Sequence, residues 1–393
     1  MNWEHPKTII GAPAEGDVFY RREYINAQFW RKAARGEHLL ISAPRRVGKT
    51  SVMKDLEQNC IDGFIAVYSD IESCKNQAEF YRRLYNLLLG LVQKSKRYKT
   101  ILADFLKSRD IGEINTTGIK IERKDLDFKN ELFELIKICG KEDTKIILML
   151  DEFPDVVSAI EKKEGKEAAI NVLHTLRNLR HDKSFSNIIL VLAGSIGIDH
   201  VISSLDRPKL INDLVPITIS ELDIVEAEEL IHQLIDDATM KISTSERAYM
   251  IEKISHLLPY YIQVFIDKSD YLLHKENRIE LTREDIDRVF NLIIEQNSYF
   301  EDWEQRLKRY LPKKDFEYCI GILTRCAHTN QYPLQKAFDF SHKAIPKTPY
   351  KSLLDSVLVK DGYLIEKNNN FRFLSPFLKA WWQKRHPEFE IMN

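Results

Sequence analysis

The residue types best suited to chemistry gather in the stretch 41–56, which reads ISAPRRVGKTSVMKDL. Gly48, Lys49 and Thr50 complete the pattern G-x-x-x-x-G-K-[ST], in which backbone N–H groups surround a phosphate at the start of a helix. The lysine carries a charge to the β- and γ-phosphates, and the threonine hydroxyl suits Mg²⁺. Ala43 replaces the first glycine, and its methyl group is tolerated as long as its φ stays negative. The stretch therefore predicts a working site for nucleotide phosphates.

The whole loop contributes to this expected site. The residues expected to bind nucleotide there are Ala43, Pro44, Arg45, Arg46, Val47, Gly48, Lys49, Thr50 and Ser51. Two of them, the adjacent arginines, flank the phosphates. Their guanidinium groups would contact nucleotide, a neighbouring subunit or a local acid, or would have only a structural role.

A pair of carboxylates follows the most apolar run of the chain, in IILMLDEF. A buried strand that ends at Asp151 and Glu152 places both at the carboxyl edge of a sheet, where α/β proteins bind ligands. Asp151 would then hold Mg²⁺, and Glu152 would orient or deprotonate an attacking water. A kinase needs no such glutamate, and the sequence has no N-K-x-D segment to read guanine. The pair thus favours hydrolysis of ATP.

Apolar strand patterns alternate with helical patterns through the first 220 residues, which predicts an α/β core with a mainly parallel sheet. The expected strands are 38–43, 64–72, 145–150, 187–195 and 215–219, with a two-stranded excursion at 111–124. Residues 221–297 read as all-helical. Residues 298–393 read as helices followed by a hairpin that turns on the run NNN, an order typical of a winged helix. We therefore expect three domains, 1–220, 221–297 and 298–393.

Together these motifs resemble the archaeal-type P-loop ATPases of the AAA+/STAND group, whose bacterial members include proteins with a C-terminal winged helix. SAPRRVGKTSV, LMLDEFPDVV, VLAGSIGI and PYYIQ carry the resemblance, which extends from about Phe19 to SPFLKAWW near the C-terminus. It implies that Phe19 and Tyr20 lie near the adenine. It also implies that Ser195 senses the γ-phosphate and that Pro259 of a helical lid packs on the adenine.

The chain departs from the pattern of this group at two places. Leu257 and Leu258 stand before the lid proline, where the group usually has glycine and histidine. The stretch LINDLVPI before the fifth strand has an acid where the group tends to have arginine. Arg207 upstream would take the role of a finger acting on a neighbouring subunit, although a plain surface arginine fits the pattern better.

Composition limits the remaining classes of protein. The 393 residues carry a formal net charge of −1, so no global field draws the chain toward nucleic acid or anionic lipid. The five cysteines are widely spaced and form no C-x-x-C pair, which favours a reducing cytoplasm over a disulfide framework or a zinc site. No apolar run is long enough to suggest a membrane span or a signal segment.

Three further groups of residues have patterns that suggest other kinds of site. AGSIG at 193–197 is one residue short of a nucleophile elbow, and the sensor role of Ser195 accounts for it better. Arg177 and Arg180 share a helix face by their i, i+3 spacing, which fits an exposed basic stripe. Lys343, Lys347 and Lys351 approach or enter the helix that would read DNA in a winged helix, although ordinary lysines of a protein-docking module fit as well.

The sequence thus leaves functions of different classes open. The first is a cytoplasmic, Mg²⁺-dependent ATPase that couples ATP or ADP binding to contacts with another protein or with its own copies. The second is an ATP-controlled protein that contacts duplex DNA through residues 298–393, as origin initiators and transposition regulators do. The third is a scaffold that binds nucleotide without hydrolysing it. The balance of 16 Lys and Arg against 11 Asp and Glu over 301–393 is too modest to decide between them.

Overall fold

A computed structural model of the protein describes residues 3–94, 126–140, 143–194, 201–202, 205 and 207–387. These residues form two compact units. The sheet unit comprises 22–42 and 52–218, and the helical unit comprises 1–21, 43–51 and 219–393. The strand pair predicted at 111–124 lies outside the described residues.

A five-stranded, all-parallel sheet forms the centre of the sheet unit, as predicted. Its order is β2-β3-β4-β1-β5. The strands are β1 (Leu39–Ser42), β2 (Phe64–Asp70), β3 (Lys145–Asp151), β4 (Ile188–Gly194) and β5 (Val215–Ile217). All seven residues of β4 are buried, as are the last six of β3. Their uninterrupted apolar sequences reflect a sheet covered on both faces.

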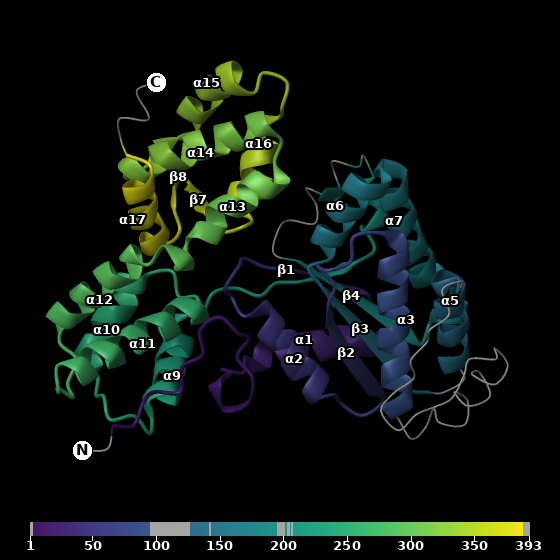
Figure 1. Ribbon diagram of the computed structural model, residues 1–393, viewed down its shortest axis with the longest axis horizontal. Helices are drawn as coiled ribbons and strands as arrows, with labels where there is room; N and C mark the ends of the chain where they lie inside the picture. The colour runs from purple at the N-terminus through teal and green to yellow at the C-terminus, as the bar shows by residue number, and fades with distance from the viewer. Residues whose placement is uncertain are drawn as a thin grey trace. The chain divides into compact units, whose positions relative to one another are not determined.

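Amphipathic helices supply that cover. The helices that lie wholly or mostly in this unit are α1 (Glu23–Ala34), α2 (Lys49–Gln58), α3 (Gln77–Lys94), α5 (Phe128–Cys139), α6 (Phe153–Glu164) and α7 (Lys166–His181). On α5 the buried residues are Leu132, Leu135, Ile136 and Cys139, a helical stripe that faces one core shared with α3, α6 and α7. Figure 1 shows α3 and α5 side by side. Short 3₁₀ turns occur at Lys183–Phe185 and Pro208–Leu210.

Residues 221–297 of the helical unit form four α-helices joined by short connections, and the starts of α9, α10 and α12 are capped by side chains. The helices are α9 (Ile224–Ile235), α10 (Thr244–Ile254), α11 (Pro259–Lys275) and α12 (Arg283–Glu295). Asp223 and Glu226 form a capping box at the start of α9, which satisfies backbone N–H groups that have no partner within the helix. Helix α11 is the central one, since it packs on both α9 and α12 and its middle residues are buried on all sides.

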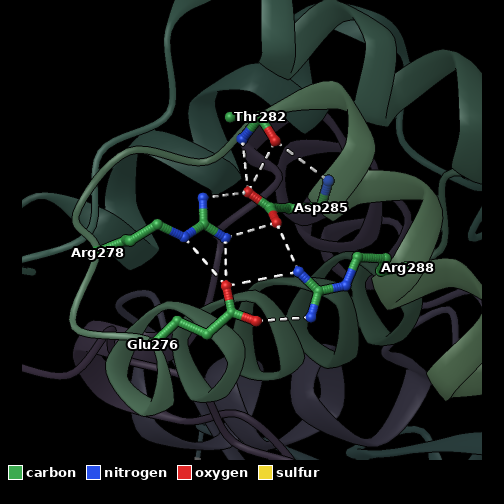
Figure 2. Close-up of polar contacts among 5 residues, drawn as sticks. All are labelled: Glu276, Arg278, Thr282, Asp285 and Arg288. Carbon is green, nitrogen blue, oxygen red and sulfur yellow. Dashed lines mark hydrogen bonds and ion pairs between the residues drawn. The ribbon is translucent and has the colours of Figure 1, made fainter.

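An ionic cluster closes the turn between α11 and α12 (Figure 2). Asp285 accepts hydrogen bonds from Arg278, at 2.6 and 2.9 Å, and from the hydroxyl of Thr282. Glu276 bridges Arg278 and Arg288 from the other side. Burial alone would raise the pKa of Asp285, but the hydrogen bonds from Arg278 and Thr282 outweigh it and lower that pKa to about 2.

The C-terminal part of the helical unit combines helices with a small antiparallel sheet of order β6-β8-β7. Its helices are α13 (Glu301–Tyr310), α14 (Lys313–His328), α15 (Leu334–Ala344), α16 (Tyr350–Leu353), which continues as a π-helical turn over Leu354–Val359, and α17 (Pro376–Arg385). The strands are β6 (Tyr332–Pro333), β7 (Leu364–Lys367) and β8 (Asn370–Phe373). Short 3₁₀ turns lie at Gly16–Val18 and Asn297–Tyr299.

The hairpin predicted at the asparagine run is present as β7 and β8. Asn368 and Asn369 both have positive φ, of 52° and 57°. Two consecutive left-handed residues match the twist of a two-residue hairpin loop, and asparagine tolerates that conformation better than most residues. The order of elements from α14 to β8 (Figure 1) thus contains the predicted helices and hairpin, together with β6 and α15, which the sequence had not indicated.

Removing the charge of Asp285 should destabilise the helical unit. We expect Asp285→Asn to lower the free energy of unfolding by about 1–3 kcal/mol, because a buried carboxylate with two arginine partners is lost while both arginines stay. Asp287→Asn on the same helix is the control. Asp287 pairs with Lys253 where both side chains are partly exposed, at 48% and 33%, so the loss should stay below about 1 kcal/mol. Urea denaturation followed by circular dichroism measures both.

The stabilising effect of Asp285 should also depend on pH. Because its pKa is lower in the folded than in the unfolded chain, the difference between wild type and Asp285→Asn should be complete above about pH 4. It should shrink as the pH falls through 3 toward 2. A difference that stays constant from pH 5 to pH 2 would show that the carboxylate is not what stabilises this turn.

Candidate functional site

The loop 43–48 joins the end of β1 to the first residue of α2, as the phosphate-loop pattern requires. Gly48 has a φ of +94°, which L side chains rarely adopt, and a Cβ built there would meet no atom within 4 Å. The backbone conformation, not crowding, therefore demands glycine at this position. Ala43 is buried and is not among the residues with positive φ, so its methyl group causes no strain.

Helix α2 begins at Lys49, and the start of a helix, where backbone N–H groups point along the axis, suits an anion. The Lys49 residue is only 7% exposed, and Ser51 and Val47 are buried as well. Burial of a charged lysine is favourable only with anionic or hydrogen-bonding partners. The loop thus presents a buried cation and a helix start together. The sequence pattern had indicated the lysine, but not its burial.

Asp151 is the last residue of β3 and is 1% exposed. Its Oδ1 accepts a hydrogen bond from the backbone N–H of Glu152 at 2.9 Å, and its Oδ2 lies 3.4 Å from the hydroxyl of Tyr68 on the neighbouring strand. Glu152 is left-handed, with φ 56° and ψ 35°, directly before α6. A glutamate in this region carries strain of about 1–3 kcal/mol, which structures tolerate mainly at functional sites.

The register of the sheet shows where the strands that lead into the loop and into the acidic pair come to an end. Leu192 of β4 pairs with Leu150 on one side and with Leu40 on the other. Asp151 and Ser42 therefore end their strands at the same carboxyl edge, with β4 between them. Chain connectivity makes the loop 43–48 leave the sheet unit at this edge.

The donor chemistry fits Mg²⁺. A carboxylate at Asp151 and a hydroxyl at Thr50 are the hard oxygen ligands that this ion prefers. Among the described residues no group of three or more His, Cys, Asp or Glu side chains could hold a metal ion. Magnesium commonly uses one or two protein oxygens and completes its shell with phosphate and water, so its binding does not require such a group.

Phe19, Tyr20 and Pro259, which the family resemblance places at the adenine, all belong to the helical unit. The Tyr20 hydroxyl donates to Glu229, and the side-chain amide of Gln233 donates to the carbonyl of Phe19 at 3.2 Å. Burial and the Glu229 carboxylate raise the pKa of the Tyr20 hydroxyl. These contacts fix the segment before α1 to helix α9. Pro259 is the first residue of α11 and is half-buried.

The two loop arginines contact residues far along the chain. Arg45 forms an ion pair with Asp302 of α13. The guanidinium carbon of Arg46 lies 4.1 Å from the ring centroid of Tyr260, beside Pro259 in the first turn of α11. The sequence left several partners open for Arg45, and the structure shows one of them, an acidic side chain of the same protein. Sequence reasoning missed both partners, because no local pattern signals a pair separated by more than two hundred residues.

Other predicted residues have mixed outcomes. Ser195 lies outside the described residues. Arg207 is exposed, in the turn before Pro208–Leu210. The exposed stripe predicted for Arg177 and Arg180 is wrong for Arg180, whose side chain is 1% exposed and binds Asp213 at 2.6 and 2.9 Å. The buried guanidinium of Arg180 needs a charged partner, and Asp213, a partly buried carboxylate before β5, provides it.

The lysines considered for DNA contact also differ from one another. Lys343 and Lys347 are exposed. Lys351 instead pairs with Asp355 one turn along the chain and with Glu366 of β7 at 2.8 Å. Its charge is already compensated within the fold, so of the three lysines considered for DNA contact only Lys343 and Lys347 are exposed.

Comparisons with known proteins agree with this architecture. No family model matches the sequence, and no curated protein matches it significantly. The Walker-type ATPase of Pyrococcus abyssi is similar in structure, with a TM-score of 0.63 and 16% identity over 93% of this chain and 96% of that one. The Aeropyrum pernix ORC2 protein, solved as ADPNP–ADP complexes, has a TM-score of 0.54 and 13% identity over 99% and 97%. The chain therefore has the α/β fold of P-loop ATPases of the Walker type.

Proposed function

We propose that the protein is a Mg²⁺-dependent ATPase that acts as a molecular switch. The observation that carries the proposal is the carboxyl edge of the sheet, where β3 ends in buried Asp151 and strained Glu152 and β1 leads into the loop that ends at Gly48. A phosphate-binding loop and an acidic pair at one edge are the two parts that triphosphate hydrolysis needs. The shared fold with a Walker-type ATPase supports the same reading.

In this proposal each residue has a separate task. Lys49 and the N–H groups at the start of α2 bind the β- and γ-phosphates. Thr50 and Asp151 hold Mg²⁺, which neutralises charge that develops on the phosphate oxygens. Glu152 positions a water and accepts its proton. Ser195 serves as the γ-phosphate sensor and Arg207 as a finger on a neighbouring copy, two roles that rest on the family resemblance alone.

We further propose a division into a nucleotide-binding core, 1–220, a helical lid, 221–297, and a winged-helix-like domain, 298–393. Phe19, Tyr20 and Pro259 would line the adenine, and the lid would respond to the nucleotide that is bound. A ligand shifts such an equilibrium only through its differential contacts with the two states, so the γ-phosphate is the group that must be sensed. The bound nucleotide would thereby control a contact of this protein with another protein or with a second copy of itself.

Two observations bear on the cellular compartment in which this switch would act. All five cysteines are free thiols, and four of them are buried, which suits a reducing cytoplasm. No helix among the described residues combines the length and the apolar character that crossing a bilayer requires. The DNA-binding alternative has less support, because Lys351 is paired within the fold.

Replacing Lys49 should abolish nucleotide binding. Because this lysine is buried, Lys49→Met is preferred to alanine, since methionine keeps most of the apolar stem and removes only the charge. We expect no measurable heat of ATP binding in calorimetry with Mg²⁺, and an unchanged circular dichroism spectrum. Lys137→Ala, which removes an exposed lysine of α5, is the control and should bind ATP normally. Normal ATP affinity in Lys49→Met would refute the assignment of the loop.

Glu152→Gln should keep ATP bound while turnover falls by about 10²–10⁴, because glutamine keeps the shape but cannot accept a proton from water. Asp151→Asn should behave differently and weaken Mg²⁺·ATP binding. Phosphate release and calorimetry on the same preparations separate the two effects. Wild-type turnover in Glu152→Gln would show that Glu152 is not the base. Absence of turnover in wild type, with tight ATP binding intact, would favour a scaffold that binds nucleotide without hydrolysing it.

A further inference from the structure

The C-terminal part of the helical unit touches the phosphate loop directly. The Arg45 side chain, 30% exposed, forms its ion pair with Asp302 of α13, which is 40% exposed. Next to it, Gly362 lies against Pro44, and a Cβ at Gly362 would come within 3.2 Å of the Pro44 Cβ. Gly362 also has a φ of +82°, so both backbone conformation and space require glycine where the chain approaches the loop.

The two contacts belong to one rigid piece. The hydroxyl of Tyr363, next to Gly362, donates to the carbonyl of Trp303 at 2.7 Å. The rings of the same two residues meet edge to face, with centroids 4.8 Å apart, and both are buried. Helix α13 and the turn 360–363 are therefore tied together, and we call them the clasp.

Arg46 is held in a similar way by the lid. Its φ of +69° is unusual for a residue with a Cβ and costs about 1–3 kcal/mol. In this conformation its guanidinium lies over the ring of Tyr260, a cation–π contact that offsets part of the strain. Both arginines of the loop thus engage protein groups of the helical unit.

The chemistry of the Arg45 contact makes it a competitor of nucleotide. A guanidinium fork binds a carboxylate and a phosphate with the same geometry. Asp302 therefore offers Arg45 a group of the kind that a nucleotide would bring to the loop. Arg306 follows Asp302 by four residues on α13, the spacing at which opposite charges on a helix can interact. Arg306 is 5% exposed, and its Nη1 has no hydrogen-bond partner among the described residues.

We propose that Asp302 competes with nucleotide phosphate for Arg45, so that nucleotide binding releases the clasp from the phosphate loop. This inference rests on the proposed ATP site. By linkage, the clasp must weaken nucleotide binding by the same factor by which nucleotide weakens the clasp. Asp302 would thereby couple phosphate binding to the position of the C-terminal part of the chain.

The test compares nucleotide affinity and loop dynamics in three full-length variants. Asp302→Asn removes the competing charge, Asp302→Glu keeps it, and Glu301→Gln removes an exposed neighbouring charge on the same helix as a matched control. Calorimetry with Mg²⁺·ATP should show binding about threefold to fivefold tighter in Asp302→Asn, the range expected for a partly exposed ion pair. Asp302→Glu and Glu301→Gln should bind like wild type.

Hydrogen exchange of the loop amides 43–48 provides a readout without nucleotide. Exchange should be faster in Asp302→Asn than in wild type, and ATP should speed up exchange in the clasp residues 360–363 of wild type. Unchanged affinity in Asp302→Asn would overturn the competition, even with faster loop exchange, while the ATP site stayed intact. Failure of every chain, wild type included, to bind ATP would instead refute the proposed function and the competition with it.

Discussion

Burial of β3 and β4 on both faces is the constraint on which the rest of the molecule depends. Two strands with no polar face cannot end inside the core, because the backbone groups beyond the last ladder bond need partners. Because all five strands run parallel, their carboxyl ends lie at one edge of the sheet, where β3 ends in Asp151. The register of the sheet fixes where β3 ends, and Asp151 is its last residue. The buried Ile, Leu and Val side chains of β3 and β4 hold that register, so their packing determines the position of the acidic pair.

Strain marks the places where the chain leaves this edge. Gly48 at the end of the loop and Glu152 at the end of β3 both have positive φ, and so does Arg46. Only the first is glycine, so at the other two positions the surrounding contacts must hold a conformation that the residue itself disfavours. The capping bond from Asp155 to the carbonyl of Glu152 is one such contact, and the ring of Tyr260 beneath Arg46 is another.

The parts of the molecule that the sequence could predict are those with a local cause. Strand identity follows from apolar runs, the hairpin from the asparagines, and the loop from the spacing of Gly48 and Lys49. The missed features depend on distant partners. Arg180 looked like a surface residue because its i, i+3 neighbour is also arginine, whereas the deciding group, Asp213, lies beyond β4. Likewise, nothing near Arg45 in the sequence points to Asp302.

Helix α11, which carries Tyr260, is held by residues near the N-terminus of the chain. Asp270 on α11 accepts hydrogen bonds from the indole of Trp3 at 2.9 Å and pairs with His5 at 2.6 Å. Gln263 on the same helix accepts the backbone N–H of Ile9 at 2.7 Å. Because Tyr260 lies in the first turn of this helix, a segment that precedes the phosphate loop in sequence helps to set the position of the ring on which Arg46 lies. Residues from the middle and the end of the helical unit thus contact the two arginines of the loop, and the N-terminal segment contributes through its hydrogen bonds to α11.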